Sequence, residues 1–245
     1  MRLFSTDIDG TIYDGSDSLA RFRDYWSRWD SGPERPFLVY NTGRSLDDTL
    51  TLIETENLPR PDYLICGVGT VIHRHEGDLL DAWHDELARE WDYDVVHAAA
   101  GEHSPARPQP EECQNPFKSS WWWEDADTAA IDDLLARISE SGVRAQAVYS
   151  SNRDLDFLPA SANKGNAVAW LADRIGVPLN DVVVAGDSGN DASMYRVPGV
   201  RGIVVANAEP ELVASTSALP VHRARARCAD GVIEGLSVLL DRVSD

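Results

Sequence analysis

The pattern of hydrophobic and polar positions divides the chain into three parts. Over residues 3–78, short apolar runs that fit buried strands alternate with amphipathic segments that fit helices. Across residues 79–162, prolines and longer polar stretches interrupt this alternation, which then resumes and continues to the end of the chain. The pattern therefore predicts one domain built from residues 1–78 and 163–245, with a second domain inserted at 79–162.

In the first and last parts, strands and helices alternate in the order that builds a doubly wound parallel sheet. Runs such as 37–40 and 182–185 are apolar at every position, which is typical of parallel strands with both faces covered. The predicted fold class is therefore α/β, with a Rossmann-like core. The predicted strands are 3–8, 37–40, 62–66, 181–185, 201–205 and 218–222, and the predicted helices are 17–30, 45–56, 164–175, 189–195, 209–214 and 231–243.

The inserted segment has the pattern of a small α+β domain. The helical spacing of Leu87, Trp91 and Val95 predicts a helix over 83–96, and the prolines of 101–116 predict a loop. With about 80 residues, the segment is long enough to fold as a subdomain. Its other predicted elements are strands at 117–123, 143–149 and 154–158 and a helix at 127–141.

The charge of the chain limits its partners. The 245 residues include 22 basic and 41 acidic side chains, which give a formal net charge of −19. Nucleic acids and anionic membrane surfaces require a basic footprint, so the charge argues against both as partners. A small phosphorylated substrate is still compatible with this charge, because a metal ion and a few cations can reverse the local field.

Three further features predict a cytoplasmic protein. The cysteines Cys66, Cys113 and Cys228 are few, widely spaced and odd in number, which favours a reducing compartment without a disulfide framework. The first residues enter a strand directly, without a charged and then apolar signal segment. No apolar run approaches the roughly 18 residues that a membrane span needs.

Carboxylates gather where predicted strands end. Asp7 and Asp9 follow the first strand, and Asp187 and Asp191 follow the strand at 181–185. Open α/β sheets bind their ligands at the carboxyl ends of strands, so these side chains are expected to converge. Close carboxylates repel one another unless a cation lies between them, and Mg²⁺ prefers oxygen ligands. The sequence therefore predicts a Mg²⁺ site formed by these four aspartates, in which Asp191 orients either the metal ligands or a nearby lysine.

Thr42 and Lys164 are candidate phosphate-binding residues. Thr42 can hydrogen-bond a phosphate oxygen, and the amides at the start of the following helix suit an anion. Lys164 opens a helix and offers a compact cation with three donors. Together with the carboxylates, these groups fit phosphoryl transfer. One aspartate attacks phosphorus to form an aspartyl-phosphate, and a second protonates the leaving alkoxide and then deprotonates the attacking water.

Four motifs, in this order along the chain, resemble those of the haloacid dehalogenase-like (HAD) phosphatases. They are Asp7-Ile8-Asp9-Gly10-Thr11, Thr42-Gly43-Arg44, Lys164, and Gly186-Asp187-Ser188-Gly189-Asn190-Asp191. The resemblance implies that Asp7 is the nucleophile and Asp9 the general acid and base. It also implies that Thr42 and Lys164 bind the phosphate, and that Asp187 and the backbone carbonyl of Asp9 bind magnesium.

The insert lies between Thr42 and Lys164, which resembles the subclass of these phosphatases with an α+β, C2-type cap domain. Several stretches resemble the sucrose-phosphate phosphatases more closely, among them Thr42-Gly43-Arg44-Ser45, Pro116-Phe117-Lys118, Asp154-Leu155-Asp156-Phe157-Leu158-Pro159 and Cys228-Ala229-Asp230-Gly231. This resemblance implies that the ligand site also includes Gly43, Arg44, Asp47, Gly186 and Asn190, with Lys118 as a contact to the sugar. From the residues alone, Arg44 fits a salt bridge as well as a ligand contact. Asp191 fits a structural role, and Lys118 fits a plain surface lysine, equally well.

The leading prediction is a Mg²⁺-dependent phosphatase for a phosphorylated disaccharide or glycoside, with sucrose 6-phosphate as the first candidate. Gly10-Thr11 stands where sucrose-phosphate phosphatases usually carry Asn-Thr, which leaves other sugar phosphates open. These include mannosyl- or glucosyl-phosphoglycerate, glucosylglycerol phosphate and hexose phosphates. A different alternative is a non-catalytic protein that binds a sugar phosphate as the partner of a sugar-phosphate synthase.

Overall fold

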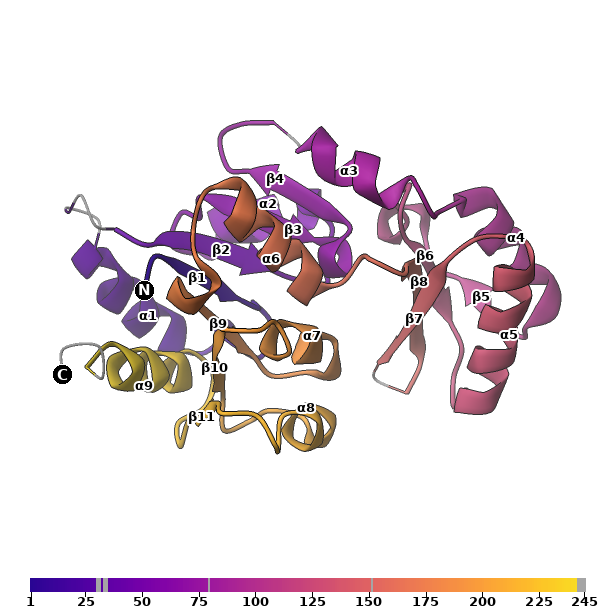
Figure 1. The fold of residues 1–245 in the computed structure, drawn as a ribbon. Coiled ribbons are helices and arrows are strands. Elements are labelled where there is room, and N and C mark those ends of the chain that lie inside the picture. The colour runs from indigo at the N-terminus through magenta and orange to yellow at the C-terminus, as the bar shows by residue number, and fades with distance from the viewer. Residues whose placement is uncertain (30–31, 33–34, 79, 151, 242–245) are drawn as a thin grey trace. The chain divides into compact units, whose positions relative to one another are not determined.

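The computed structural model of the protein describes residues 1–29, 32, 35–78, 80–150 and 152–241. It divides into two compact units, which Figure 1 shows as ribbons. The core unit comprises Met1–Leu79 and Lys164–Asp245, and the inserted unit comprises Leu80–Asn163.

A seven-stranded sheet forms the centre of the core unit. Its order is β11-β10-β9-β1-β2-β3-β4, and all neighbouring strands are parallel except β3 and β4. The parallel order confirms the predicted α/β, doubly wound fold class. The strands are β1 (Leu3–Thr6), β2 (Phe37–Asn41), β3 (Tyr63–Cys66), β4 (Val71–Arg74), β9 (Val182–Gly186), β10 (Arg201–Val204) and β11 (His222–Arg223).

Helices cover both faces of this sheet. On one face, Phe4, Tyr40 and Leu64 pack with side chains from α1, α2 and α9, and Figure 1 shows α1 and α9 side by side. On the other face, α6 contacts β3 and α7. Because both faces are covered, β9 is buried at every position. The helices are α1 (Ser18–Trp26), α2 (Leu46–Thr55), α6 (Lys164–Arg174), α7 (Ala192–Tyr195), α8 (Pro210–Ser215) and α9 (Cys228–Asp241), with 3-10 helices η1 (Ser27–Trp29), η2 (Gly67–Gly69), η4 (Leu179–Asp181) and η5 (Gly189–Asp191).

The inserted unit is built on a four-stranded antiparallel sheet in the order β5-β6-β8-β7. Trp121, Leu134 and Phe157 belong to its hydrophobic core, which is separate from that of the core unit. Its elements are α3 (Asp81–Leu87), α4 (Tyr93–His103), β5 (Arg107–Pro108), η3 (Glu111–Cys113), β6 (Ser119–Trp122), α5 (Thr128–Glu140), β7 (Ala145–Ser150) and β8 (Asp154–Pro159).

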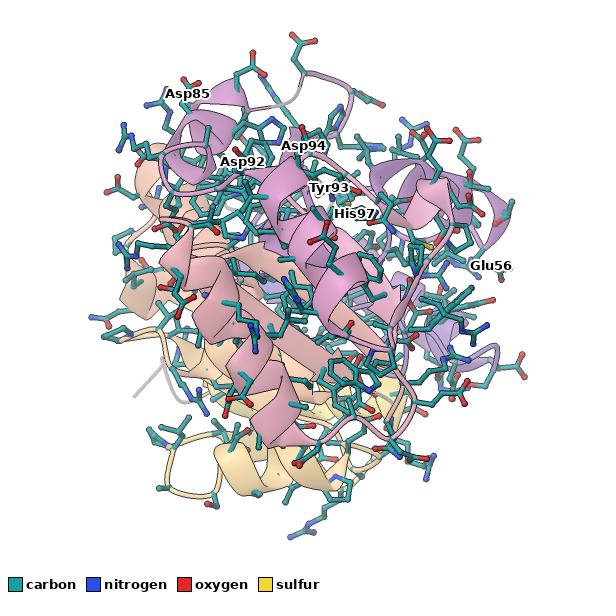
Figure 2. The ribbon with its side chains drawn as sticks, turned by 90° about the vertical axis from the view of Figure 1, so that its right-hand side faces the viewer. Glu56, Asp85, Asp92, Tyr93, Asp94 and His97 are labelled. Carbon is teal, nitrogen blue, oxygen red and sulfur yellow. The ribbon has the colours of Figure 1, made fainter. Side chains whose placement is uncertain are left out.

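Aromatic rings connect α4 to this sheet. Tyr93 and His97 lie one helical turn apart with their rings stacked at 5.2 Å, and Figure 2 shows both side chains along α4. The His97 ring lies 4.7 Å from that of Trp121, whose indole nitrogen donates a hydrogen bond to Ser119 Oγ at 2.8 Å. Since Trp121 is only 2% exposed, it belongs to the core of the inserted unit.

The predicted helix over 83–96 is two helices, α3 and α4. The second begins at a new cap, because the Asp92 side chain accepts a hydrogen bond from the backbone N–H of Val95 at 3.1 Å. Helix α4 then extends into the predicted loop 101–116, which also contains β5 and η3. The stretch 101–116 is therefore not one continuous loop, and its prolines follow the end of α4.

Other boundaries differ at strand β4 and near the carboxyl terminus. The hydrophobic pattern does not predict β4, a short strand antiparallel to β3. Strand β11 lies at His222–Arg223 rather than 218–222, and α9 begins at Cys228 rather than at residue 231. The predicted ends of helices 17–30 and 231–243 lie outside the described residues. Among the described helices, none has both the length and the apolar character needed to cross a membrane.

Candidate active site

Polar and charged side chains gather at one edge of the core sheet. Strand β1 pairs with both β2 and β9, so the segments that follow these three strands are neighbours. Asp7, Thr42 and Asp187 are the first residues after β1, β2 and β9. A cavity of about 410 Å³ opens at this edge. Its lining consists of Asp7, Asp9, Thr42, Gly43, Arg44, Asp187, Ser188, Asn190 and Glu209.

Lys164 is fully buried and joins two carboxylates. Its Nζ lies 2.8 Å from Asp7 Oδ1 and 2.6 Å from Asp191 Oδ1. Although burial works against the charged form, Asp191 and Asp7 together raise the pKa of Lys164. The side chain of Asn41 donates to the Lys164 backbone carbonyl at 3.0 Å, which holds the start of α6 against the sheet. Lys164 is therefore a fixed positive charge next to Asp7.

Asp191 orders the loop that follows β9. Its Oδ2 accepts hydrogen bonds from the backbone N–H groups of Asp187 at 2.9 Å and Ser188 at 3.0 Å. Gly186 makes room for this arrangement, because a Cβ there would lie 2.5 Å from the Asp191 side chain. Asp191 thus orients both Asp187 and Lys164. The absence of a side chain at Gly186 leaves space for the Asp191 carboxylate.

Three carboxylates lie close enough to share a cation. Asp7, Asp187 and Asp191 each offer an oxygen within 4.8 Å of the others, and Thr11 Oγ1 lies 3.1 Å from Asp187 Oδ1. Burial raises the pKa of Asp7 to about 8, despite the opposing charge of Lys164. Burial and the charge of Asp191 raise the pKa of Asp187 to about 7. The raised pKa values show that the charge of Lys164 does not fully offset the burial of Asp7 and Asp187. An additional cation would stabilise their ionised forms, and carboxylate oxygens suit a hard divalent cation.

Asp9 is paired with Arg44. The Nε and Nη2 atoms of Arg44 donate to the two carboxylate oxygens of Asp9 at 2.6 and 2.7 Å, and Nη1 donates to Asp48 Oδ2 at 2.7 Å. The hydrogen bonds and charge of these carboxylates raise the pKa of Arg44. Arg44 therefore forms the salt bridge that was one of its two predicted roles. Its contact with a ligand stays a prediction.

Thr42, Gly43 and Asn190 line the cavity, as the motifs predict for ligand-site residues. Thr42 is 1% exposed, and its Oγ1 accepts a hydrogen bond from the backbone N–H of Arg44 at 3.2 Å. This contact uses the hydroxyl as an acceptor, so its hydrogen can be donated to an anion in the cavity. The side-chain oxygen Oδ1 of Asn190 accepts a hydrogen bond from Ser188 Oγ at 3.2 Å.

Gly10 lets the loop after β1 pass directly beside Asp187. Its φ is +75°, and a Cβ at this position would lie 2.1 Å from Asp187 Oδ2. Asn207 Nδ2 holds the loop by donating to the Gly10 carbonyl at 2.7 Å. Any side chain at position 10 would require Asp187 to move. The sequence shows a departure from an Asn-Thr pattern, and the structure shows which side chain Gly10 approaches.

Three predicted ligand-site residues of the core unit do not line this cavity: Lys164 and Gly186, which are buried, and Asp47. Asp47 is exposed on the first turn of α2. Lys118 belongs to the inserted unit, where its Nζ donates to Ser120 Oγ at 2.5 Å and to Asp156 Oδ1 at 3.3 Å. With 8% exposure, Lys118 is part of a nearly buried polar cluster rather than a solvated surface lysine.

Glu209 lines the cavity although the sequence motifs do not include it. Its backbone N–H donates to the carbonyl of Asp187 at 2.7 Å, which brings the residue before α8 to the site. Ser188 also lines the cavity, inside a motif that predicts no role for it. No local sequence signal marks Glu209, because only this contact between two loops brings it near Asp187.

The parallel sheet, with the motif residues gathered at one of its edges, has the fold of solved haloacid dehalogenase-like hydrolases. The solved Synechocystis sucrose-phosphatase, in complex with sucrose and phosphate, matches with a TM-score of 0.88 and 32% sequence identity. The match covers 97% of this chain and 98% of that chain. The chain belongs to the sucrose-6F-phosphate phosphohydrolase family, which matches residues 1–239.

Two relatives of this chain are named after different substrates. The mannosylfructose-phosphate phosphatase of Agrobacterium fabrum is 43% identical over 242 residues, which are 96% of each chain. A probable sucrose-phosphatase 2 of Arabidopsis thaliana is 33% identical over 250 residues, covering 94% of this chain and 58% of that protein. The predicted resemblance and the prediction of a phosphatase are confirmed, and the relatives carry two different substrate names.

Proposed function

We propose that this protein is a Mg²⁺-dependent phosphatase that hydrolyses a phosphorylated disaccharide through an aspartyl-phosphate on Asp7. The observation that carries the proposal is the position of Asp7 in the cavity. Its carboxylate lies 2.8 Å from the buried Lys164 ammonium, and Thr42 and Asp187 line the same space. A carboxylate nucleophile, a fixed cation, a hydroxyl donor and further carboxylates are the groups that phosphoryl transfer through an aspartate requires.

Asp7 supplies the nucleophile. One of its oxygens attacks phosphorus, and the new O–P bond forms as the bond from phosphorus to the sugar oxygen breaks. Lys164 and the Thr42 hydroxyl bind the phosphate oxygens while charge moves toward the leaving oxygen. In the second step, water attacks the same phosphorus, breaks the bond to Asp7 and releases phosphate.

Asp9 moves the proton in both steps. It donates a proton to the leaving sugar oxygen and then accepts one from the attacking water. In this structure both Asp9 oxygens accept hydrogen bonds from Arg44, and each oxygen keeps a second lone pair for the proton that it transfers. Arg44 therefore positions Asp9, and its ion pair with Asp48 fixes the guanidinium in turn.

Asp7, Asp187 and the backbone carbonyl of Asp9 would hold the Mg²⁺ ion, with Asp191 behind them as the residue that orients the loop. When bound, Mg²⁺ supplies positive charge that offsets the phosphate oxygens and the carboxylates in the transition state. The support for this assignment is the distance of at most 4.8 Å between the oxygens of the three aspartates and the raised pKa values of Asp7 and Asp187.

Mg²⁺ is expected to stabilise the protein more at about pH 8 than at about pH 5, because metal binding requires ionised ligands. Burial raises the pKa of Asp7 to about 8 and of Asp187 to about 7 from the ordinary 3.8, so both are largely protonated at the lower pH. In the metal-free protein, ionising them costs stability. This cost is absent below the ordinary pKa, grows as pH rises toward the folded values, and is complete above them.

The measurement is the midpoint of thermal unfolding with and without excess MgCl₂ at each pH. Asp187→Asn should lose most of the pH-dependent part of the shift. A Mg²⁺ shift that is equal at both pH values, or larger at the acidic one, would contradict the assignment.

The proposed substrate is a phosphorylated disaccharide that contains fructose. Mannosylfructose phosphate is the first candidate, because the Agrobacterium relative has the higher identity, and sucrose 6-phosphate is the second. A sugar contact of Lys118 stays a prediction, since Lys118 and Ser120 both hydrogen-bond Asp156 within the inserted unit. A sugar-phosphate synthase as protein partner stays a prediction.

A substrate panel tests this proposal. We expect kcat/KM for mannosylfructose phosphate and sucrose 6-phosphate to exceed that for glucose 6-phosphate by about 100-fold or more. Glucosylglycerol phosphate serves as the non-disaccharide glycoside, and Asp7→Asn protein reports any contaminating phosphatase. A flat profile would indicate a general phosphatase and reject the substrate class. Tight binding of the sugar phosphates without phosphate release would reject the enzyme and favour the non-catalytic alternative.

A further inference from the structure

A second cavity of about 600 Å³ lies at the opposite edge of the core sheet. Phe37 begins β2, Tyr63 begins β3 and Arg74 ends the antiparallel β4, and all three line it. Asp7 and Thr42, by contrast, follow the carboxyl ends of β1 and β2. Because parallel strands run in one direction, the starts and ends of these strands form two different edges. The cavity is therefore separate from the candidate active site.

The described lining of this cavity has more basic than acidic side chains, in a strongly acidic protein. Its described lining has four guanidinium groups and two carboxylates, those of Asp62 and Glu76, whereas the whole chain has a net charge of −19. Anions are repelled from most of such a surface, so a local excess of arginine is where one would bind. The four arginines are Arg23, Arg35, Arg60 and Arg74.

Two of these arginines are paired with the two carboxylates. Arg35 donates through both terminal nitrogens to Asp62, which also accepts a hydrogen bond from the backbone N–H of Leu38 at 2.8 Å. This pair therefore holds the start of β2 and is structural. Arg60 lies 2.9 Å from Glu76, but the side chains are 79% and 69% exposed, so the pair is easily exchanged for another partner.

Arg23 and Arg74 remain available to a ligand. Arg23 Nη1 donates to the backbone carbonyls of Asn57 at 3.0 Å and Glu56 at 3.4 Å, which orients the guanidinium and leaves its other nitrogens to an incoming group. Arg74 is exposed at the cavity, and no ion pair or side-chain hydrogen bond to it is present within the described part of the chain. A guanidinium group suits the paired oxygens of a phosphate.

Aromatic rings form part of the wall. Phe37 and Tyr63 meet edge to face with ring centroids 6.1 Å apart, and Trp26 lies beside them in the lining. Trp26 is 2% exposed, and its indole N–H has no acceptor among the described residues. The Nδ1 atom of His75, also in the lining, is buried without a partner in the same way. Both nitrogen atoms are buried inside the wall, so the contact that the wall offers to a ligand comes from its aromatic rings.

We propose that this cavity binds a small phosphomonoester with a ring-shaped organic part. The phosphate pairs with Arg74 and Arg23, and the ring lies against Phe37 and Tyr63. The cavity volume is within the range of small-molecule sites, which favours a metabolite over a macromolecule. The site is distinct from Asp7, so its ligand acts as an effector rather than as the substrate.

Calorimetric titration of the full chain with phenyl phosphate tests the proposal. The titration is done in EDTA, because without a divalent cation the carboxylates around Asp7 repel the probe. We expect one saturable site, with affinity reduced about tenfold or more in Arg74→Met. Glu76→Gln should bind more tightly, since it removes a competing carboxylate and releases Arg60. Arg137→Met, an exposed arginine on α5, is the matched control and should bind like the natural protein.

The comparison with inorganic phosphate tests the ring contact. Phenyl phosphate should bind more tightly than phosphate, and Tyr63→Ser should remove that advantage, with thermal unfolding used to verify that each variant is folded. Absence of saturable binding overturns the proposal, as does equal affinity in Arg74→Met and Arg137→Met. Binding that Asp7→Asn changes and Arg74→Met leaves unchanged assigns the anion to the active site and also overturns it. None of these outcomes bears on hydrolysis at Asp7.

Discussion

Replacing Asp7 with asparagine is expected to lower kcat by at least about 10⁴-fold, which is the scale of losing a catalytic nucleophile. An amide cannot attack phosphorus, and the cavity lining offers no replacement in the same position. Asp9 is engaged by Arg44, and Asp187 accepts a hydrogen bond from Thr11 on the other side of the Gly10 turn. The neighbouring carboxylates therefore cannot take over the attack without rearrangement of the loop.

The protein should stay folded in this variant. Asp7 is a buried carboxyl group whose pKa burial raises to about 8, so the neutral amide removes a group that is costly to ionise. Lys164 keeps its 2.6 Å contact with Asp191. The measurement is phosphate release from mannosylfructose phosphate and sucrose 6-phosphate, together with circular dichroism and thermal unfolding. Asp173→Asn, an exposed aspartate on α6, should leave kcat unchanged. Turnover by Asp7→Asn within about tenfold of the natural protein would reject Asp7 as the nucleophile.

Replacing Lys164 with methionine is expected to lower the free energy of unfolding by about 3–5 kcal/mol, the range for removing one partner of a buried ion pair. Lys164 is fully buried between Asp7 and Asp191, and both contacts are shorter than 3 Å, at 2.8 and 2.6 Å. Without the ammonium group, two buried carboxylates face each other with no cation between them. Activity should also be lost, because the same ammonium is proposed to bind the phosphate.

Urea unfolding in metal-free buffer at about pH 8 measures this loss, and repeating it at about pH 4 tests its cause. At the lower pH the Asp7 carboxyl, whose pKa burial raises to about 8, is protonated, so the destabilisation should be smaller. Arg137→Met, at an exposed position on α5, should change stability by less than about 0.5 kcal/mol. A loss below about 1 kcal/mol for Lys164→Met would show that the buried triad does not hold the site together.

The fold class was predictable from apolar runs in the sequence, which can be recognised without knowing which strands pair. The runs 37–40 in β2 and 182–185 in β9 are apolar at every position, so the burial of both faces of these strands was predictable from the sequence pattern. Strand β4 was not predictable in this way. It is short, its sequence Val71–Arg74 ends in polar residues, and only its pairing with β3 makes it a strand. The same reason applies to β11, whose two residues pair with β10.

The residues of the candidate site likewise fall into those that the sequence predicts and those that only tertiary contacts bring to the cavity. The positions of Asp7, Thr42 and Asp187 at strand ends were predictable, because each follows a recognisable apolar run. Glu209 was not, since a single backbone hydrogen bond to Asp187 brings it to the cavity. The close approach of Gly10 to the Asp187 side chain was also hidden, because the two residues are far apart along the chain.

The sequence by itself determined the α/β class, the superfamily and the residues that carry the proposed chemistry, because strand burial and motif order are local properties of the chain. Only the tertiary structure decided how these residues are paired. Lys164 meets Asp7 across 157 positions of sequence and Asp191 across 27, and Asp9 meets Arg44 across 35. The arginine-lined cavity likewise exists only where α1, β2, β3 and β4 come together. Such contacts depend on strand order and register, which set which side chains share a space, and no local pattern contains that information.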